Sequence, residues 1–290
     1  MGTVRIPRLS RVALGLAGMT AAALALFASI PTGPQDASPP ISSPDAPPVD
    51  ALLLSGGPLT ALQHPLASAT ASPLDGVIVL VDPGHNGANG RHPAETGRLV
   101  DAGGFVKPCN STGTTSVTGG TESATNLALA RELGWQLTAL GATVAYTRTD
   151  DAGWGPCIDD RGRAAGRAGA AVAVSLHADG TENGQGRGFH VIVPAERSGY
   201  TDDIAGDSLR LGTTVRSALV TGGWTPSTYV TGDGLVVRGD LGTLNWSDVP
   251  IVMLEAGNLR NADDAELLES ADGQRHLAAA LVAALEGFLS

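Results

Sequence analysis

The sequence predicts an α/β fold, with a mainly parallel or mixed sheet and helices on both faces. Short runs of β-favouring apolar residues alternate with longer segments in which apolar residues recur at helical spacing. The short runs are continuous, which is typical of strands covered on both faces. Alternation of this kind favours strands joined by crossover helices. We therefore expect one folded domain built around a central sheet.

The first half of this domain contains two strands and two helices. Residues 77–81 are five consecutive apolar residues and predict the first strand. Apolar residues spaced along one helix face predict a helix over 121–140, and Gly141 is a suitable stop for it. A second strand is expected at 143–147, followed by an Arg- and Ala-rich helix at 158–168.

The second half continues the alternation. The predicted elements are, in order, strands at 171–176 and 189–193, a helix at 203–220, a strand at 250–254 and a closing helix at 265–289 with an interruption at Asp272-Gly273. Because most of these strands are separated by helices, a parallel arrangement is expected for most of the sheet.

The first thirty residues differ from the rest of the chain. Arg5, Arg8 and Arg11 precede a largely apolar run at 12–30, which is the pattern of a secretory signal peptide. The run is nearly long enough to span a bilayer, so an uncleaved N-terminal anchor is the alternative for 1–30. We expect a secreted, periplasmic or cell-wall-associated protein, in contact with a membrane only through such an anchor.

A linker is predicted between this segment and the domain. Ten of the eighteen prolines lie in residues 31–73, among Ala and Ser. The folded domain is then 74–290, and the net charge of −11 resides there because three Arg and three Asp cancel before it. Nucleic-acid binding requires clustered Lys and Arg, so we expect no nucleic-acid partner.

The two cysteines, Cys109 and Cys157, both lie in the folded domain. In an exported protein the first expectation is a disulfide bond between them. Two buried thiols, or two zinc ligands, are the alternatives, although a Cys-x-x-Cys pair that would favour a zinc site is absent from the sequence.

Three polar residues follow the ends of predicted strands. His85 comes after the first strand and a short turn, while His177 and Glu255 directly end the strands at 171–176 and 250–254. If these strands are parallel, all three side chains meet at the sheet edge where α/β proteins bind ligands. Singly, each has a plainer interpretation, as a turn residue or a strand cap. Burying the Glu255 carboxylate without a partner, however, costs roughly several kcal/mol.

Together these residues suit a metal centre. Two imidazoles and a carboxylate form a catalytic zinc site with an open fourth position. Glu122 begins the long helix, where a lone Glu would commonly only complement the helix dipole. A further glutamate, close to the water in the fourth position of the zinc but not bound to the metal, could transfer protons.

At this point the sequence resembles the zinc-dependent N-acetylmuramoyl-L-alanine amidases of the bacterial cell wall. The matching segments are Val81-Asp82-Pro83-Gly84-His85, Gly120-Thr121-Glu122, Ser175-Leu176-His177-Ala178, and Glu255-Ala256-Gly257 with Asn261 nearby. They occur in the family's order, and the resemblance as a whole covers residues 76–289. Any one motif is weak evidence, but four in order are strong.

The resemblance implies that His85, Glu122 and His177 bind Zn2+ and that Glu255 is the catalytic carboxylate. The domain at 74–290 would then be a zinc amidase catalytic domain. Its substrate would be peptidoglycan or a muropeptide, cut at the amide bond between N-acetylmuramic acid and L-alanine. A monomer is expected.

The sequence departs from the family at several places. Thirty-six residues separate His85 from Glu122, more than is usual, and eight of them are glycines, so the insertion at 86–121 is expected to be a surface loop. A disulfide bond would then tie it to the segment around Cys157. Asn258 stands where the family often has an aromatic residue.

Several polar residues receive no role beyond structure. These are His64, His92, His190 and His276, together with Asp82, which is expected to orient its turn. Two other functions remain alternatives: a zinc peptidase that cuts within the stem peptide, and a non-catalytic wall-binding domain with structural zinc.

Overall fold

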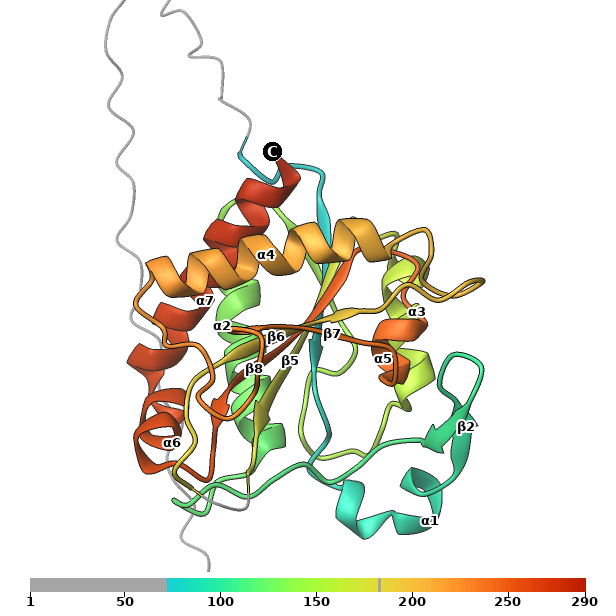
Figure 1. Cartoon of the computed structure of the whole chain (residues 1–290), viewed down its shortest axis with the longest axis vertical. Helices are drawn as coiled ribbons and strands as arrows, with labels where there is room; N and C mark the ends of the chain where they lie inside the picture. Colours follow the sequence, from blue (N-terminus) through green and yellow to red (C-terminus); the bar gives the residue numbers. More distant parts are fainter. Residues whose placement is uncertain (1–71, 182–183) are drawn as a thin grey trace, which may run out of the picture. The chain divides into compact units, whose positions relative to one another are not determined.

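The computed structural model of the chain describes residues 72–181 and 184–290, all within one compact unit, Pro65–Ser290 (Figure 1). The predicted segment 1–30 and nearly all of the predicted linker at 31–73 lie outside the described residues. Across 72–181 and 184–290, no helix combines the length and apolar character needed to cross a membrane.

A six-stranded mixed sheet forms the centre of the unit, in the strand order β4-β1-β5-β8-β6-β7. The first four strands in this order are parallel to one another, β6 is antiparallel to β8, and β7 is parallel to β6. The strands are β1 (Ile78–Pro83), β4 (Thr143–Tyr146), β5 (Val172–Asp179), β6 (His190–Pro194), β7 (Leu235–Arg238) and β8 (Ile251–Asn258). The predicted fold class is confirmed.

Helices cover both faces of this sheet (Figure 1). One face carries α2 (Glu122–Ala139), α4 (Ala205–Thr221), α6 (Ala262–Glu269) and α7 (Ala271–Leu289), and the other carries α3 (Ile158–Ala168) and the short α5 (Gly242–Asn245). Alternate strand residues therefore enter different cores. In β1, Val79 and Val81 pack under α2, whereas Leu80 packs on the α3 side. This explains why the strands are apolar without interruption.

The boundaries differ from the prediction in two informative places. β5 and β8 continue past the apolar runs, so His177 and Glu255 lie within strands and pair with each other in register. The C-terminal helix is broken at Ser270, earlier than predicted, because its side chain accepts a hydrogen bond from the Gly273 N–H and caps α7. β7 and α5 had no clear sequence signal.

The insertion at 86–121 has more structure than a loop. It contains a 3-10 turn (Asn89–Arg91), α1 (Pro93–Thr96) and a hairpin of β2 (Leu99–Asp101) and β3 (Val106–Pro108). A disulfide bond joins Cys109, just after β3, to Cys157, just before α3, with an S–S distance of 2.08 Å. The predicted disulfide is confirmed, and the thiol and zinc-ligand alternatives for these cysteines no longer apply.

Candidate functional site

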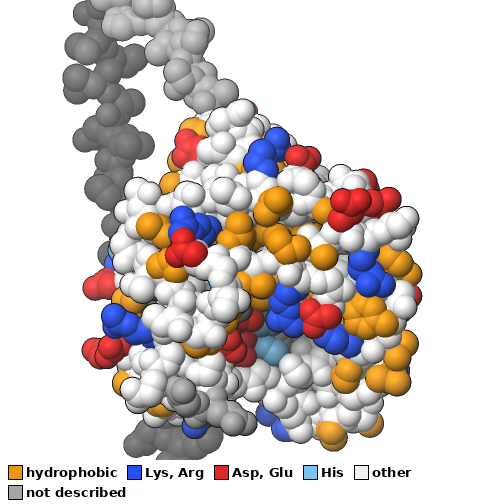
Figure 2. All heavy atoms as spheres, viewed as in Figure 1, with side chains coloured by type: hydrophobic (Ala, Val, Ile, Leu, Met, Phe, Trp, Pro, Cys, Tyr) orange, Lys and Arg blue, Asp and Glu red, His pale blue; other side chains and the backbone are white. Residues whose placement is uncertain are grey.

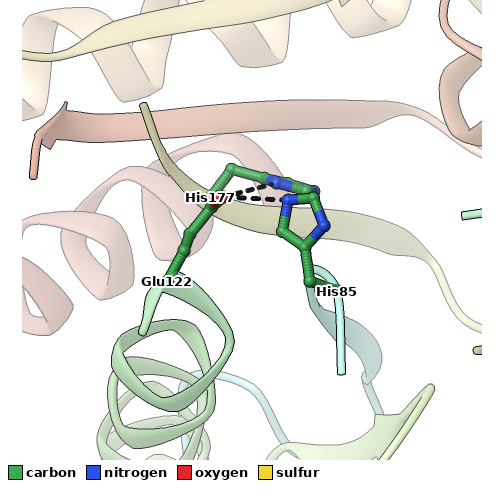
Figure 3. A group of neighbouring side chains, drawn as sticks. All are labelled: His85, Glu122 and His177. Carbon is green, nitrogen blue, oxygen red and sulfur yellow. Dashed lines mark hydrogen bonds and ion pairs between the residues drawn. The ribbon is translucent and has the colours of Figure 1, made fainter. Parts of the chain in front are cut away.

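Three side chains predicted to bind a metal converge at the carboxyl ends of the parallel strands (Figure 3). Oε1 of Glu122 lies 3.1 Å from Nε2 of His85 and 3.0 Å from Nδ1 of His177. Each comes from a different element: the loop after β1, the first turn of α2, and β5. The parallel pairing of β1 with β5 brings the two histidines to the same edge.

The loop that carries His85 is held by two buried arginines. His85 itself has a φ of +57°, a backbone conformation that is uncommon for residues other than glycine. Arg148 donates hydrogen bonds to the carbonyl oxygens of Pro83 and Gly84. Arg161 donates to the carbonyl oxygens of Pro83 and His85. These contacts fix three successive carbonyls and hold the loop in this conformation.

Asp82 anchors Arg161 from the end of β1. Its Oδ1 lies 2.5 Å from the Arg161 Nη1, and both side chains are almost fully buried. Ser175 donates to the second carboxylate oxygen, and Thr147 donates to the first. Burial alone would raise the pKa of Asp82, but Arg161 and the two hydroxyls together lower it below its ordinary value. Asp82 thus orients its turn, as expected, through a buried ion pair.

Glu122 is oriented by backbone donors as well as by the histidines. The N–H of Ala178 donates to Oε1, and the N–H of Thr114 donates to Oε2. Its position in the first turn of α2 also favours a negative charge. Burial would raise the pKa of this carboxyl, but hydrogen bonds and charge from His177 and His85 lower it overall. The side chain of Glu122 is therefore deprotonated.

The donor set fits a metal cation. Nδ1 of His85 lies 3.0 Å from the carbonyl oxygen of Ser111, which can only accept, so Nδ1 carries the proton in the neutral ring. Nε2 of His85 then directs its lone pair towards the Glu122 carboxylate. Burial lowers the pKa of His177 and favours its neutral form as well. A metal cation can bind among these electron-rich atoms, and His–Glu–His is a donor set that zinc accepts.

Glu255 lies beside this cluster without belonging to it. It pairs in register with His177 on β5 and with His190 on β6, so the three side chains form one row across the sheet. Among the residues that the structure describes, no group donates a hydrogen bond to the buried Oε2. Burial raises its pKa well above the ordinary value, and the charges of Glu122 and Asp179 raise it further.

The cluster opens into a cavity of about 330 Å³. His85, His177 and Glu255 line it together with Met253 and residues of the insertion and of α5. A second hollow shares the same three polar residues and is also lined by Glu122 and Asp179. Figure 2 shows histidine atoms in a hollow on one face of the molecule, with acidic and basic side chains beside them.

A family profile described as N-acetylmuramoyl-L-alanine amidase matches residues 79–287. The chain belongs to this amidase family. It is 38% identical over 238 residues to N-acetylmuramoyl-L-alanine amidase Rv3717 of Mycobacterium tuberculosis, covering 81% of this chain and 96% of that protein.

Solved structures of amidases agree with this assignment. Ami1, the N-acetylmuramyl-L-alanine amidase of Mycobacterium smegmatis, is 37% identical, with a TM-score of 0.70 over 74% of this chain and 98% of the other. Ami1 of Mycobacterium abscessus has the same identity and TM-score, with 74% and 100% covered. An amidase of Clostridium difficile 630, at 24% identity and a TM-score of 0.57 over 73% and 96%, shares the fold.

Within this amidase fold, all four predicted site residues lie in one neighbourhood, but the sequence did not reveal their surroundings. Arg161 carried no signal beyond an Arg-rich helix. Ser111 lies in an insertion expected on the surface, yet its carbonyl oxygen contacts His85. His190 received no role, but it neighbours Glu255 because β6 runs antiparallel to β8. That pairing cannot be read from β6 alone.

Two other motif residues have structural roles. Asn261 caps α6, since its Oδ1 accepts hydrogen bonds from the N–H groups of Asp263 and Asp264. The amide of Asn258 is fully buried and donates to Thr181 and to the carbonyl oxygen of Gly186. Asn258 thereby holds Thr181 and Gly186, which follow β5 in the chain, against the end of β8.

Proposed function

We propose that this protein is a zinc-dependent hydrolase that cleaves the amide bond between N-acetylmuramic acid and L-alanine in peptidoglycan. His85, Glu122 and His177 would hold the metal, and Glu255 would transfer the proton. The observation that carries this proposal is an unpaired, buried carboxylate oxygen of Glu255 beside a His–Glu–His donor set in an open cavity. Membership in the amidase family supports the choice of bond.

The metal centre is supported by the way the chain prepares its donors. The Ser111 carbonyl oxygen sets the tautomer of His85, and two backbone N–H groups orient the Glu122 carboxylate. When bound, zinc polarises the carbonyl of the scissile amide and lowers the pKa of water. The protein supplies three ligands and leaves the cavity side open for substrate.

Glu255 would transfer the proton. In the proposed reaction, its Oε2 accepts a proton from the water whose oxygen attacks the amide carbon. The same carboxyl then donates that proton to the nitrogen of L-alanine as the carbon–nitrogen bond breaks. The products are a carboxylate on the lactyl group of the sugar and a peptide with a free amino terminus. Burial and neighbouring negative charges favour proton uptake by Glu255.

Two alternatives make different use of the same site. A zinc peptidase acting within the stem peptide would require the same ligands and the same proton carrier. A wall-binding domain with structural zinc would have no use for a carboxylate such as Glu255, because a structural site is closed by four protein ligands. The openness of the site favours an enzyme, and the family favours the amidase.

We propose that residues 1–30 direct export, that 31–73 form a linker, and that 74–290 act as a monomeric catalytic domain on the cell wall. The disulfide bond between Cys109 and Cys157 supports an oxidising compartment.

Mass spectrometry of muropeptides tests the proposal. Purified protein with zinc is expected to release intact stem peptides with a free L-alanine amino group, together with peptide-free glycan. Glu255→Gln, which keeps the side-chain shape, serves as the matched inactive control. Shortened peptides would establish the peptidase alternative, and unchanged muropeptides would establish a non-catalytic role.

A further inference from the structure

Two cationic side chains are among the described residues that line the cavity beside the metal centre, Lys107 and Arg161. The guanidinium group of Arg161 has no free N–H group with which to bind a ligand. Its five N–H groups face Asp82 and four backbone carbonyl oxygens, two of them on the loop that bears His85. Lys107 is therefore the cation in this cavity that can contact a substrate.

Lys107 retains both charge and hydrogen-bonding capacity. Its Nζ donates to the Asp240 backbone oxygen at 2.5 Å and lies 3.3 Å from a carboxylate oxygen of the same residue. That carboxylate already accepts two hydrogen bonds from Arg238, at 2.9 and 2.8 Å, which lower its pKa. Two cations thus share one anion. The third N–H group of Lys107 has no partner within 72–181 and 184–290, and the side chain is 35% exposed.

The positive charge of Lys107 stands out in an acidic protein and beside acidic side chains. The chain has a net charge of −11, and Lys107 is its only lysine. The cavity also contains Glu255, and Glu122 lies beside it. The proposed zinc ion would offset the charge of Glu122, whereas Lys107 lies on the β2–β3 hairpin, outside the metal-binding cluster. Lys107 would attract an anionic group of a substrate and can therefore orient it.

We infer that the Lys107 ammonium group binds a carboxylate of the stem peptide and so makes the enzyme select peptides by their charge. This inference rests on the proposed amidase function. A neutral glycan offers no group that needs a cation, whereas the stem peptide carries carboxyl groups that occur either free or as carboxamides. Lys107 acts in substrate selection and takes no part in proton transfer.

Steady-state kinetics on matched muropeptides tests the inference. The two substrates differ only in whether the second residue of the stem carries a carboxylate or a carboxamide. Lys107→Met is expected to raise KM for the carboxylate substrate about five- to tenfold, the size of a solvent-screened ionic hydrogen bond, with kcat unchanged. For the carboxamide, KM should stay constant. Lys107→Arg should retain the preference.

Arg275→Met is the matched control, because Arg275 is another exposed cation paired with an aspartate, on α7. It should leave both KM values unchanged. Raised salt should reduce the discrimination by the unmodified protein and leave that of Lys107→Met unchanged. Equal KM changes for the two substrates in Lys107→Met, or no change in either, would overturn the inference.

A measurement without turnover separates this inference from the proposed function. In Glu255→Gln, an amine-reactive reagent can label only Lys107 and the amino terminus, which peptide mapping distinguishes. The carboxylate muropeptide is expected to protect Lys107 from labelling, and the carboxamide is not. Protection of Lys107, combined with no cleavage of either substrate by the unmodified protein, would refute the amidase proposal and uphold the role of Lys107. Equal labelling with both ligands would refute that role even in an active amidase.

Discussion

The backbone of Gly84 passes directly against the imidazole of His177. A Cβ atom added at Gly84 would lie 2.6 Å from Nδ1 of His177, and closer still to Cε1 and Nε2. Real Cβ atoms do not approach rings this closely, so the histidine could not keep its place. The absence of a side chain at Gly84 therefore lets the loop after β1 and strand β5 bring their histidines together.

Gly84→Ala is accordingly expected to impair metal binding although it removes no ligand. Displacement of His177 should lower zinc affinity by at least about tenfold, comparable to the loss of a contact that orients a ligand. Competition with a chelator, read by metal analysis, measures this effect. Gly206→Ala is the matched control, because a Cβ there meets no atom within 4 Å. Equal zinc affinity in the two variants would contradict the packing argument.

Direct removal of a ligand should have a larger effect. The purified protein is expected to contain about one zinc per chain, and His177→Ala should retain much less, since a zinc site needs its three protein donors. Inductively coupled plasma spectrometry measures the content. His92→Ala is the control, because His92 pairs with Glu95 outside the cluster. Full occupancy in His177→Ala would remove His177 from the ligand set.

Glu255→Gln should separate chemistry from metal binding. Loss of the proton carrier is expected to reduce turnover by at least ~10²-fold, with zinc content and folding retained. Glu266→Gln, on the exposed side of α6, should keep full activity. If Glu255→Gln loses zinc together with activity, Glu255 is a ligand. If it keeps both, another residue carries the proton.

The buried pair of Arg161 and Asp82 makes a prediction about stability. Arg161→Met leaves the Asp82 carboxylate buried without its partner and should lower the free energy of unfolding by about 3–5 kcal/mol at pH 7. Urea unfolding of metal-free protein measures it. Arg167→Met, which breaks an exposed pair on the same helix, should change little.

The same pair predicts the pH dependence of this loss. The folded-state pKa of Asp82 is below its ordinary value of 3.8, so its contribution is complete above that pH and is lost as pH falls through the folded pKa. In Arg161→Met, burial should instead raise that pKa. The deficit in unfolding free energy relative to the unmodified protein should then shrink as pH decreases from 7 to about 4. A constant deficit would show that the pair does not cause it.

Local sequence patterns predicted most of the helices and strands. The periodicity of 121–140 and the composition of 158–168 identified α2 and α3 to within one residue at each end, because helix caps and spacing are short-range properties. Helix signals were weaker near Ser270, where one serine side chain decides the break. β7 and α5 are four residues each and are too short to leave a periodic signal.

The sequence by itself determined the α/β class and the elements that carry His85, Glu122, His177 and Glu255, since these depend on residue type and local order. It predicted the disulfide bond between the two cysteines but left thiols and zinc ligands as alternatives, which the structure removed. Only the tertiary structure decided what surrounds those residues. Arg161 holds the His85 loop by hydrogen bonds to its backbone. The insertion brings Ser111 and Lys107 to the site, and the antiparallel pairing of β6 with β8 brings His190 next to Glu255. Strand register and the return of an insertion to the site depend on contacts between residues far apart in the chain, which no local pattern encodes.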